Sequence, residues 1–135
     1  MIRILLVADS GLVMSNVTAT LCRIDRVEIV AYASGRAPVE AIVRAVRPDV
    51  VLVDEMCWPG LAIARVSEIG KASPAANVIG LVERPDASWI VDGLRAGAAA
   101  VVPRELEPAT LALVLQEVLG ESYTADARKH ERRAA

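Results

Sequence analysis

The chain has 135 residues, a formal net charge of -2, and 54% hydrophobic against 24% charged residues. This length suits one domain with a substantial core, and no apolar run approaches the roughly 20 residues that span a bilayer. The charge balance argues against direct nucleic-acid binding by this chain, and the two cysteines are too few for a disulfide framework. We therefore expect a cytoplasmic protein without a membrane segment.

Short β-branched runs alternate with amphipathic segments along the whole chain. The expected strands are, in chain order, Ile2–Ala8, Val27–Ala33, Asp49–Asp54, Asn77–Val82 and Ala99–Val102. The expected helices are Leu12–Cys22, Pro38–Val46, Leu61–Lys71, Asp86–Ala96 and Glu107–Leu119. Three of the strands are nearly continuous apolar runs, which is typical of parallel strands covered on both faces. The pattern predicts an α/β fold of the (βα)5 flavodoxin-like type, a five-stranded parallel sheet in the order 2-1-3-4-5 with helices on both faces.

Two carboxylates follow strands that should be neighbours in this sheet. Asp9 comes directly after the first strand and Asp54 ends the third. Ligands of this fold bind beyond the carboxyl ends of the strands, where the strand order reverses, and neighbouring strands lie about 5 Å apart. We therefore expect the two carboxylates to face each other across that crevice. The alternative is that each one caps the next helix or turn.

Three stretches carry a family resemblance: IRILLVADS, VEIVAYASGRAPVEAIVRAVRPDVVLVD and VDGLRAGAAAVVPRELEPATL. With them the chain resembles, over residues 1–123, the CheY-like receiver domain of two-component response regulators, and in particular the NarL/FixJ (LuxR-type) branch. The resemblance implies a histidine kinase as partner, and a helix-turn-helix DNA-binding domain that follows in a longer protein. Residues 124–135, basic from Ala127 onward, are expected to be a linker or a disordered tail.

The receiver family transfers a phosphoryl group from a kinase phosphohistidine to an aspartate with the help of Mg²⁺, by positioning and charge neutralisation. By resemblance, Asp54 is the phosphoacceptor candidate and Asp9 the second acid of the acid pair. Ala8 stands in place of the first acid and Val82 in place of a Ser or Thr hydroxyl. Arg104 replaces the family's lysine, and its planar fork does not act as a point charge. The resemblance therefore implies a weak or absent Mg²⁺ site at Asp9 and Asp54.

Further departures surround this pocket. Val101 occupies the position of the family's aromatic switch residue. Trp58 is expected to pack on the third helix, with a cover over the pocket as the alternative. Glu55 and Glu83 are expected to be solvated charges, with replacement of the missing acid as the alternative.

Arg104 can reach Asp54 if its side chain turns inward from the end of the last strand. Such a pair would remove the cost of a lone buried charge, and we expect it. The alternative is an arginine that points to the surface.

Together these features predict an atypical receiver domain that acts without phosphorylation, as a dimerisation or interaction module in transcriptional regulation. A working phosphoreceiver, with Mg²⁺ on Asp9, Asp54 and Glu55, is one alternative, and a regulator that binds a small molecule is another. No independent enzyme is expected, because the sequence has no Gly-rich phosphate loop and no paired nucleophile and base, and its one histidine, His130, lies in the tail.

A homodimer is the expected assembly. The fourth helix, fifth strand and fifth helix commonly form the family's dimer face, which here includes Trp89, Arg95, Leu113, Gln116 and Glu117. Trp89 and Leu113 would form a small exposed apolar patch on this face. An interface through the first and fifth helices is the alternative.

Overall fold

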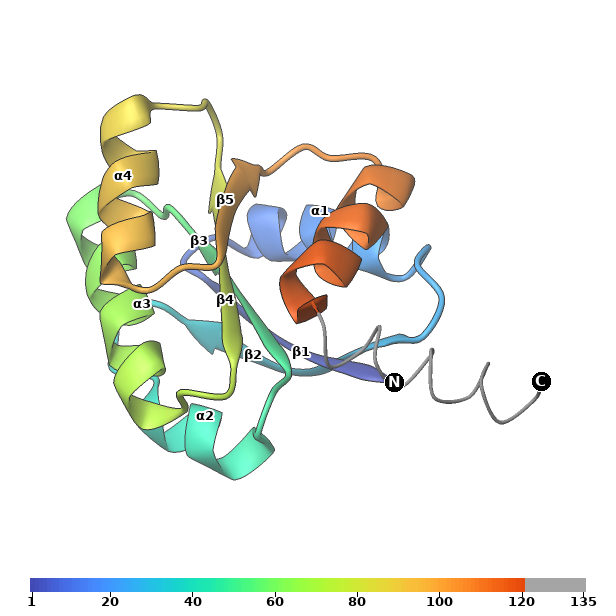
Figure 1. The fold of residues 1–135 in the computed structure, drawn as a ribbon, viewed down its shortest axis with the longest axis horizontal. Helices are drawn as coiled ribbons and strands as arrows, with labels where there is room; N and C mark the ends of the chain where they lie inside the picture. The colour runs from blue at the N-terminus through green and yellow to red at the C-terminus, as the bar shows by residue number, and fades with distance from the viewer. Residues whose placement is uncertain (121–135) are drawn as a thin grey trace.

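The structure is a computed structural model, and it describes residues 1–120. Its five strands are all parallel and form one sheet in the order β2-β1-β3-β4-β5. Helices cover both faces of this sheet (Figure 1). The predicted fold class and strand order are therefore confirmed.

The elements follow one another in strict alternation. The strands are β1 (Ile2–Ala8), β2 (Val27–Ser34), β3 (Val50–Asp54), β4 (Asn77–Val82) and β5 (Ala100–Pro103). The helices are α1 (Gly11–Leu21), α2 (Glu40–Val46), α3 (Pro59–Ala72) and α4 (Ala87–Ala96). A last helix, here called the C-terminal helix, covers residues 108–120. Each expected strand and helix is present, with starts and ends that differ by no more than two residues from those predicted.

The core has two halves, one on each face of the sheet. Successive side chains of a strand point to opposite faces, so Leu5 and Val7 of β1 pack under α2, α3 and α4, whereas Ile4 and Leu6 pack under α1 and the C-terminal helix. Every residue of β3 is buried, since both of its faces are covered. This explains why the strand reads as a continuous apolar run up to Asp54.

Trp89 lies in the core and not on the surface. Only 4% of this residue is exposed, so its predicted place in an exposed dimer patch is wrong. Helical spacing alone did not decide whether the side chain of Trp89 points to the core or to solvent. In the folded chain the ring packs in a slot against β4. Leu113 is 65% exposed, and the polar members of the predicted face are exposed as well: Arg95, Gln116 and Glu117.

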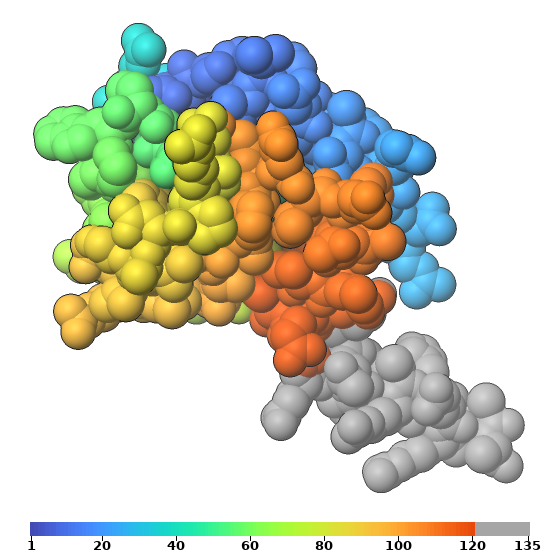
Figure 2. All heavy atoms as spheres, turned by 90° about the horizontal axis from the view of Figure 1, so that it is seen from above, coloured from blue at the N-terminus to red at the C-terminus, as the bar shows by residue number. Residues whose placement is uncertain are grey.

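The carboxyl ends of the strands meet at one edge of the sheet. Figure 2 looks onto this edge, where the segments that follow β1 (blue), β3 (green), β4 (yellow) and β5 (orange) gather. Within residues 1–120, no helix has the length and apolar character needed to cross a membrane. The predicted tail over residues 124–135, and the last residues of the predicted domain, lie outside the described part of the chain.

Candidate functional site

Asp54 lies at the carboxyl edge of the sheet and is 1% exposed, the only buried charged residue among residues 1–120. The residues that directly follow β3 and β5 are both hydrogen-bonded to the end of β4. Glu55 N donates to Leu81 O at 2.8 Å, and Arg104 N donates to Val82 O at 2.7 Å. These backbone bonds continue the ladder past the strand ends and place the side chain of Arg104 beside Asp54.

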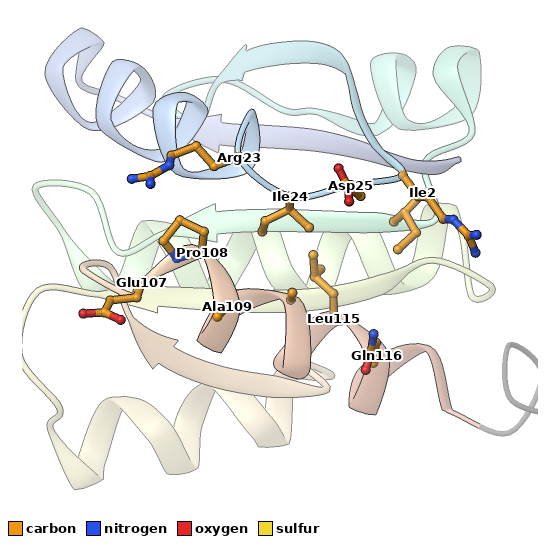
Figure 3. A pocket seen from close by; sticks show the side chains of 11 residues that line it. Ile2, Arg23, Ile24, Asp25, Glu107, Pro108, Ala109, Leu115 and Gln116 are labelled. Carbon is orange, nitrogen blue, oxygen red and sulfur yellow. The ribbon is translucent and has the colours of Figure 1, made fainter.

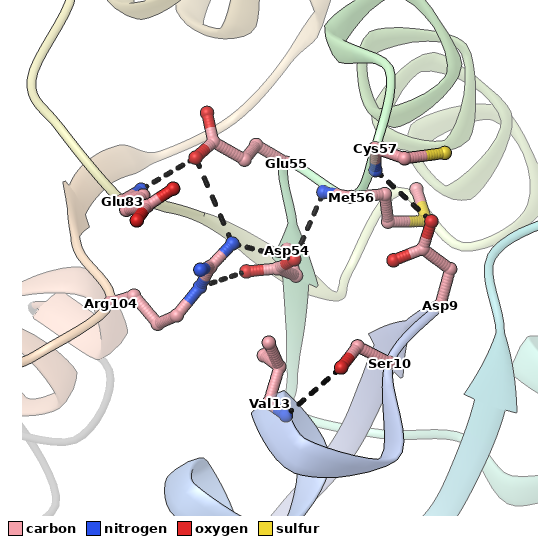
Figure 4. A network of polar contacts seen from close by, with 9 residues as sticks. All are labelled: Asp9, Ser10, Val13, Asp54, Glu55, Met56, Cys57, Glu83 and Arg104. Atoms are coloured by element: carbon pink, nitrogen blue, oxygen red, sulfur yellow. Dashed lines mark hydrogen bonds and ion pairs between the residues drawn. The ribbon is translucent and has the colours of Figure 1, made fainter.

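Arg104 forms a two-point ion pair with Asp54. Its Nε donates to Oδ1 at 2.7 Å and its Nη2 donates to Oδ2 at 3.0 Å. Oδ2 also accepts from Met56 N at 2.9 Å, as Figure 4 shows. The pairing that the sequence led us to expect is present, and it engages both carboxylate oxygens in charge-assisted hydrogen bonds.

The environment of Arg104 favours the protonated, charged form of its guanidinium. Partial burial lowers the pKa of the guanidinium, but the hydrogen bonds and charge of Asp54, with the charges of Glu55 and Glu83, outweigh it, so the pKa lies above its usual value. Since an arginine is already protonated at every physiological pH, the ion pair does not depend on titration of Arg104.

Glu55 joins this network from the other side. Its Oε1 accepts from Glu83 N at 2.7 Å and lies 3.7 Å from Nη2 of Arg104. The side chain of Glu55 is 19% exposed, so the prediction of a solvated charge is wrong for this residue. The sequence did not reveal this contact, because the amide that binds Glu55 lies in the loop after β4, 28 positions further along the chain. Glu83 itself is exposed, as expected.

Asp9 is directed toward the loop after β3, and not toward Asp54 (Figure 4). Its Oδ2 accepts from Cys57 N at 3.0 Å. Burial raises the pKa of Asp9, but bonds from the Cys57 thiol and amide and the charge of Arg36 outweigh it and lower the pKa below the usual value. The same thiol contact raises the pKa of Cys57. Ser10, and not Asp9, caps α1, by accepting from Val13 N.

The donor set does not fit a magnesium ion in this arrangement. Mg²⁺ binds through free carboxylate oxygens and waters in near-octahedral geometry, whereas the oxygens of Asp54 are held by a guanidinium and an amide. Ala8 supplies no side-chain oxygen. Residues 1–120 contain no cluster of three His, Cys, Asp or Glu side chains that could hold a metal ion. A cation at Asp54 would also lie against the positive charge of Arg104.

The remaining pocket positions are apolar. Val82 is 1% exposed at the end of β4, and Val101 of β5 is partly buried against the cluster that contains Trp89. Trp58 is 65% exposed. Its indole lies against Gly60, where Nε1 is 3.2 Å from the position that a Cβ would take. It therefore contacts the first turn of α3 at Gly60 but stays mostly exposed, so the prediction that Trp58 packs on the third helix holds only for this local contact.

Met56 and Gly35 are parts of the site that the sequence did not reveal. Met56 is 8% exposed and has φ of 59°, a left-handed conformation that a side chain of this kind rarely adopts. In this conformation its amide points at Asp54 and its thioether covers Gly35. A Cβ at Gly35 would lie 2.2 Å from the Met56 sulfur. The absence of a Cβ at Gly35 thus lets the end of the Met56 side chain approach closely, although the Ser-Gly signal indicated only a turn.

An arginine and a glutamate of α3 hold the segment around Gly35. Arg65 Nε donates to Gly35 O at 2.8 Å, and its Nη1 donates to Glu68 Oε2 at 2.8 Å. Glu68 Oε1 accepts from the amides of Val39 and Glu40. The first turn of α2 has no side-chain cap of its own, so Glu68 supplies the cap from a distant part of the chain.

A cavity of about 730 Å³ lies on another side of the molecule, between the α1–β2 loop and the C-terminal helix (Figure 3). Its lining combines the charged side chains of Arg23, Asp25 and Glu107 with apolar Ile24 and Leu115. The lining contains neither Asp54 nor any of its hydrogen-bond partners. The site around Asp54 and this cavity are therefore separate places.

Comparison with known proteins gives a consistent picture of the fold. No family model matches the chain. A protein-glutamate methylesterase/protein-glutamine glutaminase 3 of Anaeromyxobacter dehalogenans (strain 2CP-C) is 31% identical over 109 residues, which are 80% of this chain and 32% of that protein. The chain thus spans about a third of the length of this curated relative.

Two solved structures show the similarity in three dimensions. The signal receiver domain of the NarL response regulator of Mycobacterium tuberculosis has a TM-score of 0.74 at 23% identity, covering 89% of this chain and 98% of that one. A LuxR-family two-component response regulator of Aurantimonas sp. SI85-9A1 has a TM-score of 0.74 at 23% identity, covering 98% of each chain. The chain therefore has the fold of response regulator receiver domains.

Proposed function

We propose that this chain is the receiver domain of a response regulator and that it works without phosphorylation, as an interaction module in transcriptional regulation. The receiver fold and the resemblance of Asp54 to the phosphoacceptor support the first part. The observation that carries the second part is the two-point pair between Arg104 and Asp54.

The pair opposes phosphoryl transfer for a physical reason. A carboxylate oxygen must be free to attack phosphorus, and the charge that develops must be neutralised by groups held in place. Here both oxygens of Asp54 already accept hydrogen bonds from Arg104. Breaking a buried pair of this kind from one side costs about 3–5 kcal/mol, which opposes any rearrangement that frees Asp54 for attack. Val82 also offers no hydroxyl to a phosphoryl oxygen. In this arrangement the guanidinium, and not a metal ion or a phosphoryl group, binds both oxygens of Asp54.

The test is addition of millimolar Mg²⁺ with beryllium fluoride or acetyl phosphate. We expect no mass increase and no saturable change in the fluorescence of Trp58, which follows Asp54 by four residues and is exposed. The matched control restores three family residues through Ala8→Asp, Val82→Thr and Arg104→Lys, and this variant should respond. A saturable response of the parent chain that Asp54→Ala abolishes would refute phosphorylation independence and favour a working phosphoreceiver.

We further propose that two copies associate through the face of α4, β5 and the C-terminal helix. Three apolar side chains stand out from this face: Val91 at 43%, Leu94 at 47% and Leu113 at 65% exposure. Between β5 and the C-terminal helix the surface is hollowed and lined by apolar residues, among them Val102 and Val114. In this proposal a DNA-binding domain elsewhere in a longer protein supplies the output, and this chain has no enzymatic activity of its own.

Sedimentation velocity tests the dimer. Leu113→Glu should weaken the association by about tenfold or more, which is the usual cost of losing an apolar anchor of an interface. Leu12→Glu is the matched control, because Leu12 is 72% exposed on α1. Weakening by Leu12→Glu alone would assign the interface to α1 and the C-terminal helix, and a monomeric parent chain would remove the dimer from the proposal.

A further inference from the structure

The helix α4 places one large buried side chain against the sheet, with Ala96 partly buried beside it. Its buried residues are Trp89 and Gly93, and Gly93 has no side chain. By comparison, α3 buries Ala62, Val66 and Ile69. Within residues 1–120, no side chain of another element hydrogen-bonds to α4, whereas α2 is tied to α3 through Glu68.

The indole of Trp89 fits a slot that two glycines create. A Cβ at Gly80 of β4 would lie 2.7 Å from Cη2 of the ring, and a Cβ at Gly93 would lie 2.7 Å from Cζ3. The Cγ2 atom of Val101 lies 3.4 Å and 3.2 Å from these two positions. The ring therefore occupies the space in which the side chains of a strand and a helix would otherwise meet.

The N–H group of this indole has no partner. Nε1 of Trp89 is buried without a hydrogen bond among residues 1–120. A buried donor that loses its bond to water weakens the state in which it is buried. Burial of the ring favours the docked helix, and the unpaired N–H opposes it, so only the docked state carries this cost.

We propose that Trp89 is a latch: α4 separates from β4 and β5 as a unit, with the indole leaving its slot, in a step distinct from global unfolding. Opening adds an indole to the apolar surface that α4 already presents through Val91 and Leu94. The latch involves neither Asp54 nor its hydrogen-bond partners, so it stands whether or not the chain is a phosphorylation-independent receiver.

The test compares one substitution in two helices. Trp58→Phe leaves Trp89 as the sole tryptophan, because the chain has two. In this background Gly93→Ala places a methyl group in the space of the ring, whereas Gly70→Ala in α3 meets nothing within 4 Å. Gly93→Ala should move the emission of Trp89 to that of an exposed indole and raise its quenching by acrylamide several-fold. Helical circular dichroism should persist, and Gly70→Ala should change neither signal.

A folded Gly93→Ala chain with the ring still buried would overturn the latch. If this variant does not fold, native-state hydrogen exchange of the Trp58→Phe chain decides. The amides of α4 should then exchange at least about tenfold faster than those of α3, through an opening with little sensitivity to denaturant. Exchange of α4 only by global unfolding would overturn the proposal as well.

A change of one group tests the role of the unpaired N–H. Incorporation of β-(3-benzothienyl)alanine at position 89 replaces the N–H by sulfur and keeps the shape of the ring. Exchange of the α4 amides should slow by about one to two powers of ten, since the docked state no longer holds an unpaired donor. An unchanged exchange rate would show that the N–H does not set the opening.

Discussion

Replacement of Arg104 by alanine is expected to lower the free energy of unfolding by about 3 kcal/mol, the lower end of the range for breaking a buried ion pair from one side. Asp54 is 1% exposed and would keep only its bond from Met56 N. The loss comes mainly from the carboxylate that remains buried without a counter-charge, and less from the contacts of the arginine. Urea denaturation followed by circular dichroism measures it.

A double-mutant cycle separates the pair from its parts. The double variant Asp54→Ala/Arg104→Ala should be more stable than Arg104→Ala alone, because it no longer buries an unpaired charge. Arg104→Lys should fall in between, since an ammonium cannot make both bonds of the planar fork. A loss below about 1 kcal/mol for Arg104→Ala would mean that the pair behaves like one on the surface.

Replacement of Glu68 by alanine is expected to cost about 2–3 kcal/mol, because it leaves two helix-start amides without an acceptor and a largely buried arginine without its counter-charge. The amides are those of Val39 and Glu40, and the arginine is Arg65, whose side chain is 12% exposed. Chemical denaturation of the single variant against the parent chain gives the loss directly.

The chain offers a matched control in the same helix start. Glu40→Ala breaks the pair of Glu40 with Arg44, whose side chains are 50% and 63% exposed, and should cost less than about 0.5 kcal/mol. Glu68→Gln keeps one acceptor oxygen and should lose about half as much as Glu68→Ala. Equal effects of Glu68→Ala and Glu40→Ala would contradict the cap from α3.

The fold was predictable because the sequence signals for strands, helices and turns each span only a few residues. Alternation of apolar runs with helical periodicity fixes the order of elements, and the right-handed crossover then leaves few sheet orders. The pair between Arg104 and Asp54 was predictable for a related reason. Asp54 ends β3 and Arg104 directly follows β5, so parallel strands bring both to the same edge of the sheet, and their charges are opposite.

The contacts that escaped prediction depend on geometry between distant segments. Trp89 is buried because Gly80 and Gly93 leave a slot for its ring. The apolar periodicity of α4 gives no information on the glycine in β4. Glu55 is held by an amide after β4. Asp9 is held by an amide after β3, so the prediction that it faces Asp54 is wrong. A backbone amide leaves no mark in the sequence, so carboxylates that it binds look like free surface charges.

The position of β1 has a consequence for how the chain is synthesised. This first strand pairs with both β2 and β3, so it leaves the ribosome before either of the strands that it pairs with. The apolar face that carries Ile79 and Leu81 lacks its cover until Leu111 and Leu115 of the C-terminal helix have emerged. A nascent chain stalled before residue 108 would therefore expose an apolar face of the sheet. Exposed apolar surface of this kind binds chaperones and promotes aggregation.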